Sequence, residues 1–215
     1  PLIGGGDHHR SGVAIQTPAT NIDPRRDSIA YQGRELRPPE PVYLLLNKPR
    51  GYTCSAKDPH AERLITELLP KDCPRLFTVG RLDRDSEGLI ICTNDGNFSQ
   101  QVAHPSHEVP KTYQVTVRGS VTPTKLKQLV RGITDSGERL VAQSADHAST
   151  TADGTEIIIL VIAEGRNREI RRMCDQMQWQ VRRLLRTAIG EIRDPDLKPG
   201  RSRPLTKQER ESLIL

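Results

Sequence analysis

The sequence predicts an α+β protein built on a mixed, mainly antiparallel sheet flanked by helices. Short apolar runs of strand length are interspersed with segments whose apolar residues recur at helical spacing. Several of these runs are separated by brief polar turns, which is typical of β-hairpins. Strands and helices mixed in this way along one chain favour the α+β class.

The composition favours a protein with an aliphatic core and no membrane span. Only 34% of the 215 residues are hydrophobic and 3% are aromatic, so the core must be aliphatic. No apolar stretch approaches the ~20 residues of a membrane span, and no signal peptide is visible in a sequence that begins without Met. The four cysteines are far apart and form no CxxC pair, which favours free thiols and a cytoplasmic location.

The first forty residues predict a small N-terminal region. Residues 1–11 contain a Gly run and a His pair, which indicates a disordered start. Residues 12–36 contain two short strands, Val13–Ile15 and Ser28–Gln32, separated by a charged turn. Residues 37–41 are rich in proline and predict an extended linker.

The next elements follow from apolar spacing. We expect strands at residues 42–46, 76–79, 89–92 and 111–118, and helices at residues 61–69 and 97–103. The strand at residues 111–118 is the clearest, because Tyr113, Val115 and Val117 alternate with polar neighbours. A loop with Pro49 and Gly51 follows the first strand and predicts a fixed turn.

The rest of the chain continues to alternate between strands and helices. Thr122 and Pro123 predict the start of a helix, and Gly132 predicts its end. Strands are expected at residues 141–144 and 156–163, a helix capped by Asn167 at residues 167–177, and an irregular strand at residues 181–192.

The segment from Val79 to Gly96 carries the candidate catalytic acid. Two apolar runs flank a charged turn, and Gly80 and Gly88 bracket that turn, so the backbone can reverse tightly at both ends. Asp83 therefore lies on a stiff scaffold, where a reacting carboxylate would be placed. Spacing alone does not distinguish Asp83 from Asp85.

The order Gly-Arg-Leu-Asp, then Ser-Glu-Gly-Leu, then Thr-Asn-Asp-Gly resembles the catalytic motif of bacterial ribosomal RNA pseudouridine synthases of the RsuA family. Asn47-Lys48-Pro49-Arg50-Gly51 resembles a second family motif. The resemblance covers residues 42–207 and implies the pseudouridine synthase fold for a catalytic domain at residues 42–215. It implies that Asp83 is the catalytic residue, and that residues 12–36 resemble the closing strands of an S-four-like RNA-binding domain whose basic helix pair is not in this sequence.

Two further residues complete the expected site. Ile170, Met173, Cys174 and Met177 follow helical spacing, which puts Arg171 on the shoulder of the core-facing side. A guanidinium there needs an anionic partner, and the resemblance implies that Arg171 pairs with Asp83. The family pattern Lys-x-Tyr appears as Lys111-Thr112-Tyr113, which implies that Tyr113 stacks on the flipped uracil or its sugar.

A cluster of arginines predicts contacts with phosphate groups. Seven arginines fall between positions 166 and 186, and guanidinium groups bind phosphate oxygens in planar, bidentate pairs. The residues expected to bind RNA are Lys48, Arg81, Arg84, Lys111, Arg166, Arg168 and Arg172, although a structural role for Lys48 is equally compatible with its turn. The histidines lack the spacing of metal ligands, and the reaction needs no redox step or group donor, so we expect neither metal nor cofactor.

The expected function is conversion of one uridine of ribosomal RNA, in a stem-loop, to pseudouridine by a monomer. The motifs resemble those of the large-subunit members of the family, which implies 23S rRNA as substrate. The alternatives are a small-subunit (16S) rRNA enzyme, a non-catalytic rRNA-binding assembly protein, and a hydrolase that uses Asp83 and Asp85 as a carboxylate pair.

Overall fold

The computed structural model describes residues 8–10, 13–14, 27–37, 39–55, 58–103 and 109–214. The chain divides into two units, residues 1–40 and 41–215, and the boundary falls within the expected linker. The functional motifs all lie in the second unit.

The first unit contains a small antiparallel sheet in the order β2-β1-β3-β4. Its strands are β1 (His8–Arg10), β2 (Val13–Ala14), β3 (Ile29–Tyr31) and β4 (Arg34–Leu36). The expected disordered start is wrong for His8–Arg10, because the backbone of these residues pairs with β3. The charged turn expected at residues 23–27 lies mostly outside the described residues, and the S-four-like character of residues 12–36 stays a prediction.

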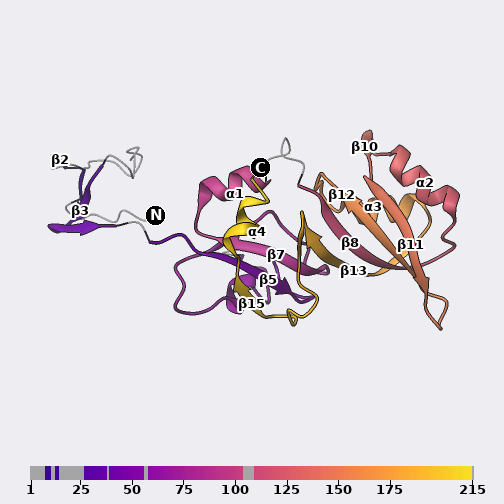
Figure 1. Ribbon diagram of the computed structural model, residues 1–215, viewed down its shortest axis with the longest axis horizontal. Coiled ribbons are helices and arrows are strands. Elements are labelled where there is room, and N and C mark those ends of the chain that lie inside the picture. Colours follow the sequence, from indigo (N-terminus) through magenta and orange to yellow (C-terminus); the bar gives the residue numbers. More distant parts are fainter. Residues whose placement is uncertain are drawn as a thin grey trace. The chain divides into compact units, whose positions relative to one another are not determined.

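The second unit is built on one large sheet whose strands run in the order β11-β12-β8-β13-β7-β5-β15 (Figure 1). In addition, β6 pairs with β7 and β14 pairs with β13. The strands are β5 (Tyr43–Lys48), β6 (Phe77–Val79), β7 (Glu87–Thr93), β8 (Lys111–Arg118), β11 (Ser144–Thr150), β12 (Glu156–Ile162), β13 (Gln180–Ile189), β14 (Ile192–Arg193) and β15 (Ser202–Pro204). A separate hairpin joins β9 (Ile133–Asp135) and β10 (Glu138–Leu140).

Helices cover both faces of this sheet. They are the 3-10 turn η1 (Ile65–Leu68) and the α-helices α1 (Gly96–Ala103), α2 (Pro123–Arg131), α3 (Glu169–Gln176) and α4 (Lys207–Glu211). Leu44 and Leu46 of β5 belong to the apolar cluster that includes the buried residues of α2 and α3, whereas Leu45 belongs to the cluster that includes those of α1. Successive strand residues point to opposite faces, so the two clusters lie on opposite sides of β5 and β7.

The sheet is mixed because one neighbouring pair, β13 and β7, is parallel. Only two residue pairs are in register there, Leu185 with Glu87 and Arg186 with Gly88. This short junction joins one half of the sheet (β11, β12, β8, β13) to the other (β7, β5, β15). The expected α+β class with a mainly antiparallel sheet is confirmed.

Glycine at position 88 is required by the junction. Gly88 has a φ of +108°, and a Cβ atom there would lie 2.2 Å from the carbonyl oxygen of Arg186. Side chains rarely adopt this φ, and no side chain fits at that distance from backbone. The close approach of β7 to β13 therefore depends on the absence of a side chain.

Two expected elements differ from the structure. The helix predicted at residues 61–69 is only the turn η1, because Leu64 is extended and forms a bridge with Thr53. The strand predicted at residues 141–144 instead begins at Ser144 and runs to Thr150 as the polar strand β11. In contrast, β8 has the predicted bounds, and α2 starts after the Thr122 cap and ends before Gly132.

Candidate active site

The turn that carries Asp83 connects β6 to β7 and is fastened to the loop after β5. The Gly51 amide donates to the carbonyl of Arg84 at 2.7 Å, and the Leu82 amide donates to Sγ of Cys54 at 3.4 Å. Within the turn, the Ser86 amide donates to the carbonyl of Asp83 at 3.0 Å. Asp83 is therefore held by backbone contacts on both sides.

Lys48 is the internal support of this turn. Its side chain is fully buried, and its ammonium donates to the carbonyl of Ser86 at 2.6 Å, of Pro49 at 3.2 Å and of Arg84 at 3.5 Å. Burial lowers the pKa of Lys48, and the neighbouring Cys54 and acidic groups oppose that shift. The expectation that Lys48 contacts RNA is wrong, because its ammonium is buried and donates to the carbonyl oxygens of the turn.

We expect Lys48→Met to destabilise the protein by about 3 kcal/mol, because several buried carbonyl groups lose their donor. Chemical denaturation of Lys48→Met and of the exposed control Lys71→Met measures this difference. Pseudouridine formation should fall for Lys48→Met even at temperatures where the variant is folded. Equal unfolding midpoints for the two variants would show that the ammonium does not hold the turn.

Two arginines near the start of α3 face the acids of the turn. Nη1 of Arg168 lies 3.7 Å from Oδ2 of Asp83 and 3.6 Å from Oδ1 of Asp85. Nη2 of Arg171 lies 2.9 Å from Oδ2 of Asp85 and donates to the carbonyl of Asp85 at 3.3 Å. The expected pair between Arg171 and Asp83 is therefore wrong: Arg171 binds Asp85, and Arg168 is the arginine within reach of Asp83.

The backbone at the start of α3 has an unusual conformation. Arg168, and not the predicted Asn167, is the N-cap residue of α3, and it adopts a left-handed conformation with φ of 49° and ψ of 31°. This conformation costs an L-residue about 1–2 kcal/mol. Arg171, one turn further along α3, is only 14% exposed, whereas Arg168 is 49% exposed. Strain of this kind, beside a reactive group, is typical of functional sites.

Asp83 lines a pocket of about 240 Å³. Tyr113 of β8, Leu184 of β13 and Ile162 of β12 supply its apolar lining, and Arg166 and Arg168 supply its charge. Asp83 and Tyr113, predicted from separate motifs, are thus brought to one cavity. Ser86 also lines it, and within the described part of the chain Oγ of Ser86 and Nε of Arg171 are buried without a hydrogen-bond partner.

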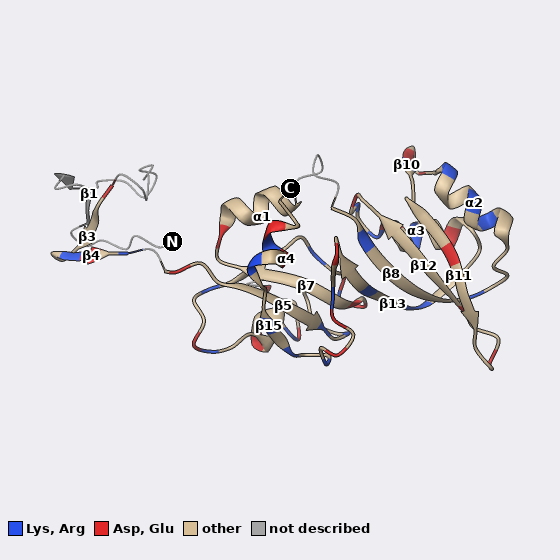
Figure 2. Ribbon diagram, viewed as in Figure 1, with Lys and Arg blue, Asp and Glu red and all other residues tan. Residues whose placement is uncertain are grey.

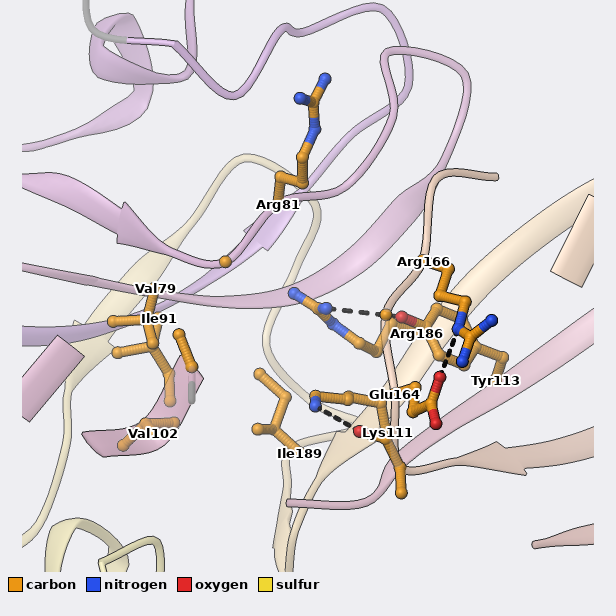
Figure 3. Close-up of a pocket in the computed structure, with 14 residues that line it drawn as sticks. Val79, Arg81, Ile91, Val102, Lys111, Tyr113, Glu164, Arg166, Arg186 and Ile189 are labelled. Atoms are coloured by element: carbon orange, nitrogen blue, oxygen red, sulfur yellow. Dashed lines mark hydrogen bonds and ion pairs between the residues drawn. The ribbon is translucent and has the colours of Figure 1, made fainter. Parts of the chain in front are cut away.

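A second pocket of about 520 Å³ adjoins the first and shares Arg81, Tyr113, Gly165 and Arg166 with it (Figure 3). Arg186 of β13 reaches into this second pocket. Its Nε donates to the carbonyl of Leu89 at 2.6 Å, and its Nη1 donates to the hydroxyl of Tyr113 at 3.5 Å. We expected Arg186 only as one of the clustered arginines that contact phosphate groups, although its buried strand position, between Leu184 and Ala188, was a signal of a role inside the site.

The other residues expected to bind RNA lie in three different settings. Arg81, Lys111 and Arg166 line the second pocket. Arg84 is exposed and pairs with Glu62 at 2.6 Å. The expectation for Arg172 is not supported, because its Nε and Nη1 bind Asp135 and Glu138 at 2.6 Å and its Nη2 donates to the Asp135 carbonyl. Figure 2 shows basic segments on α2, β8 and β13.

No three His, Cys, Asp or Glu side chains of the described part of the chain are grouped as metal ligands. None of its helices is long and apolar enough to cross a membrane.

Comparison with known proteins identifies the family. The sequence model for RNA pseudouridylate synthases matches residues 42–176, which include Asp83, Tyr113 and Arg171. The chain belongs to the RNA pseudouridylate synthase family. The expected resemblance is thereby confirmed. The match covers the Gly-Arg-Leu-Asp motif of Asp83 and the Lys-x-Tyr motif of Tyr113, which both contribute to the pocket of Asp83.

Several relatives of this family are similar over most of the chain. The ribosomal large subunit pseudouridine synthase B of Bacillus subtilis is 36% identical over 85% of this chain and 75% of its own length. The ribosomal small subunit pseudouridine synthase A of Escherichia coli is 34% identical over 94% of this chain and 87% of its own length. A putative chloroplast large-subunit enzyme of Arabidopsis thaliana is 36% identical over 94% of this chain, which spans 53% of that protein.

Solved structures agree with the family. A crystal structure of a pseudouridylate synthase matches 97% of this chain and 89% of its own, with a TM-score of 0.73 and 30% sequence identity. The pseudouridine synthase fold is therefore confirmed for this protein.

Proposed function

We propose that this protein converts a uridine of ribosomal RNA to pseudouridine, with Asp83 as the reacting carboxylate. The observation that supports this most strongly is the pocket in which Asp83 of the catalytic turn and Tyr113 of β8 share one cavity. Its size of about 240 Å³ suits a single nucleoside drawn out of its stack.

The reaction exchanges one bond of the uracil for another. The bond between C1′ of the ribose and N1 of the base breaks, the base rotates, and C5 of the base bonds to C1′. The proton on C5 is then removed, and N1 gains a proton. Asp83 acts at the sugar by one of two routes, adding to C1′ or removing the 2′ proton to give a glycal, and both routes begin with an ionised carboxylate.

The neighbouring residues have distinct parts in this proposal. Tyr113 supports the base with its ring, and either its hydroxyl or Asp83 takes the proton from C5. Arg168, whose Nη1 lies 3.7 Å from Oδ2 of Asp83, places a positive charge beside the reacting carboxylate. Arg171 positions the turn through Asp85 and does not contact Asp83 in the way first expected.

For the substrate, we propose large-subunit ribosomal RNA. The Bacillus subtilis and Arabidopsis thaliana relatives, each 36% identical, are named for the large subunit. The Escherichia coli relative, 34% identical, is named for the small subunit, so 16S rRNA is the second candidate. The target is proposed to be a stem-loop uridine, since unstacked loop bases are the usual objects of RNA recognition.

We further propose a monomer that acts in the cytoplasm. The cysteines of the described chain, Cys54, Cys73, Cys92 and Cys174, are all free thiols. Free thiols are typical of proteins in reducing compartments.

Mapping of pseudouridine tests this function. The protein is incubated with 23S and 16S rRNA transcripts, and the modified positions are located by chemical mapping. We expect one uridine of 23S rRNA to be converted, at the same rate with and without EDTA, because no step needs a metal ion. Modification confined to 16S rRNA would overturn the large-subunit assignment, and loss of activity in EDTA would overturn the metal-free mechanism.

A further inference from the structure

The second pocket combines an apolar wall with cationic hydrogen-bond donors. Val79, Ile91 and Val102 form one side of it, opposite Tyr113 and Arg166, with the side chains of Arg186 and Lys111 between the two sides (Figure 3). Its volume of about 520 Å³ is within the range of sites that enclose small organic groups.

Arg186 has an unused donor in this pocket. Its side chain is 5% exposed, and within the described residues its Nη2 has no hydrogen-bond partner. A buried donor without an acceptor is unfavourable, and a ligand oxygen would satisfy it. The group therefore points to a ligand that supplies an acceptor.

Lys111, which is half-buried, supplies a second donor. Its ammonium donates to the carbonyl of Ala163 at 2.9 Å, which leaves further N–H groups. Burial, followed by the nearby charge of Arg186, lowers the pKa of Lys111 to about 8. Arg186 and Lys111 thus place two cationic donors in the pocket. The carboxylate of Glu164, which also lines the pocket, is already paired with Arg166. The two donors therefore favour a ligand that supplies an acceptor.

The position of the pocket indicates the origin of its ligand. Arg81 and Arg166 line both this pocket and the pocket of Asp83. A strand whose target nucleoside occupies the first pocket would pass these two arginines with its next phosphate, which guanidinium groups bind well. The base of the following nucleotide then meets the apolar wall.

We infer that the second pocket binds the base of a nucleotide adjacent to the target uridine and selects guanine, through its O6 atom, or uracil, through its O4 atom. Arg186 and Lys111 donate to that oxygen. The exocyclic amino group of adenine or cytosine would instead face these donors. This inference rests on the proposed function and assigns the pocket a part in choosing the target sequence.

Filling the pocket from its rim tests the inference. Ala103, at the exposed end of α1, lines the second pocket but not that of Asp83. We expect Ala103→Trp to raise the KM for the mapped rRNA roughly tenfold or more, with a smaller change in kcat, because a lost base contact weakens binding by about that factor. Gln100→Trp, at an exposed position of the same helix, is the matched control and should keep the wild-type KM.

A second variant tests the choice of base. The transcript is prepared with the adjacent guanine or uracil replaced by adenine or cytosine, and the ratio of kcat/KM for the two transcripts is measured. We expect the wild-type ratio to be roughly tenfold or more, and Arg186→Gln to reduce it, because an amide both donates and accepts. If Arg186→Gln acted only by losing its contact with Tyr113, kcat/KM would fall for both transcripts and the ratio between them would stay unchanged.

The outcomes separate this inference from the proposed function. No pseudouridine from the wild-type protein on either rRNA would refute the proposed function, and the inference with it. Wild-type activity with an unchanged KM for Ala103→Trp, or a mapped uridine flanked on both sides only by adenine or cytosine, would refute the inference alone.

Discussion

Asp83→Asn is expected to abolish pseudouridine formation, lowering kcat by at least about 10³-fold, while the fold stays intact. The amide nearly matches the carboxylate in size but cannot act as a base or add to the sugar. The fold should tolerate it, because the ion pair of the Asp83 side chain, with Arg168, is long at 3.7 Å and partly exposed. Single-turnover assays on mapped rRNA, with thermal unfolding in parallel, measure both effects.

Asp85→Asn is the matched control, two residues along the same turn. Asp85 binds Arg171 at 2.9 Å, and an asparagine oxygen can still accept from that guanidinium. The loss of activity should therefore be far smaller than for Asp83→Asn. Equal losses in the two variants would mean that the turn carries no distinct catalytic acid at position 83.

Gly88→Ala is expected to have the largest effect on stability, more than about 3 kcal/mol. The added methyl group would lie 2.2 Å from the carbonyl oxygen of Arg186 and 2.6 Å from its nitrogen, so the backbones of β7 and β13 must separate. The substitution also adds the strain of a positive φ, about 1–2 kcal/mol. Denaturant unfolding, compared at equal m-values, gives the change in free energy.

Gly154→Ala separates the two contributions. Gly154 also has a positive φ, of +76°, but an added Cβ there meets nothing within 4 Å. It should cost only the backbone strain. If Gly88→Ala unfolds at the same midpoint as Gly154→Ala, the close approach of the two strands does not limit the stability of the sheet.

The helices and strands that the sequence predicted well are those whose signals lie within their own residues. From Thr112 onward, strand β8 alternates between polar and apolar residues, and α2 has its own cap at Thr122 and its own terminator at Gly132. The segment at residues 61–69 has helical spacing too, but Ile65 donates its amide to the carbonyl of Thr53. A partner distant in sequence keeps Leu64 extended, and local spacing cannot reveal it.

The sequence predicted which residues form the site better than it predicted which arginine pairs with which acid. Motifs identified Asp83 and Tyr113 separately, and the structure brings both to one pocket. The partner of Arg171 was missed because Asp83 and Asp85 differ by two positions on a tight turn. The left-handed backbone of Arg168, at the start of the helix that carries both arginines, was not predictable either, because position 168 has no glycine or asparagine to signal it.

The narrow junction between β7 and β13 has a consequence for how such an enzyme can diverge. The turn of Asp83 leads directly into β7, while Tyr113 lies on β8 beside β13, so their spacing depends on two registered residue pairs. The hairpin of β9 and β10 and the turn between β11 and β12 lie away from that junction. Insertions and substitutions there can reshape the surface offered to an RNA without moving the reacting groups. A single chemistry can thus be retained while its target changes from one ribosomal RNA to another.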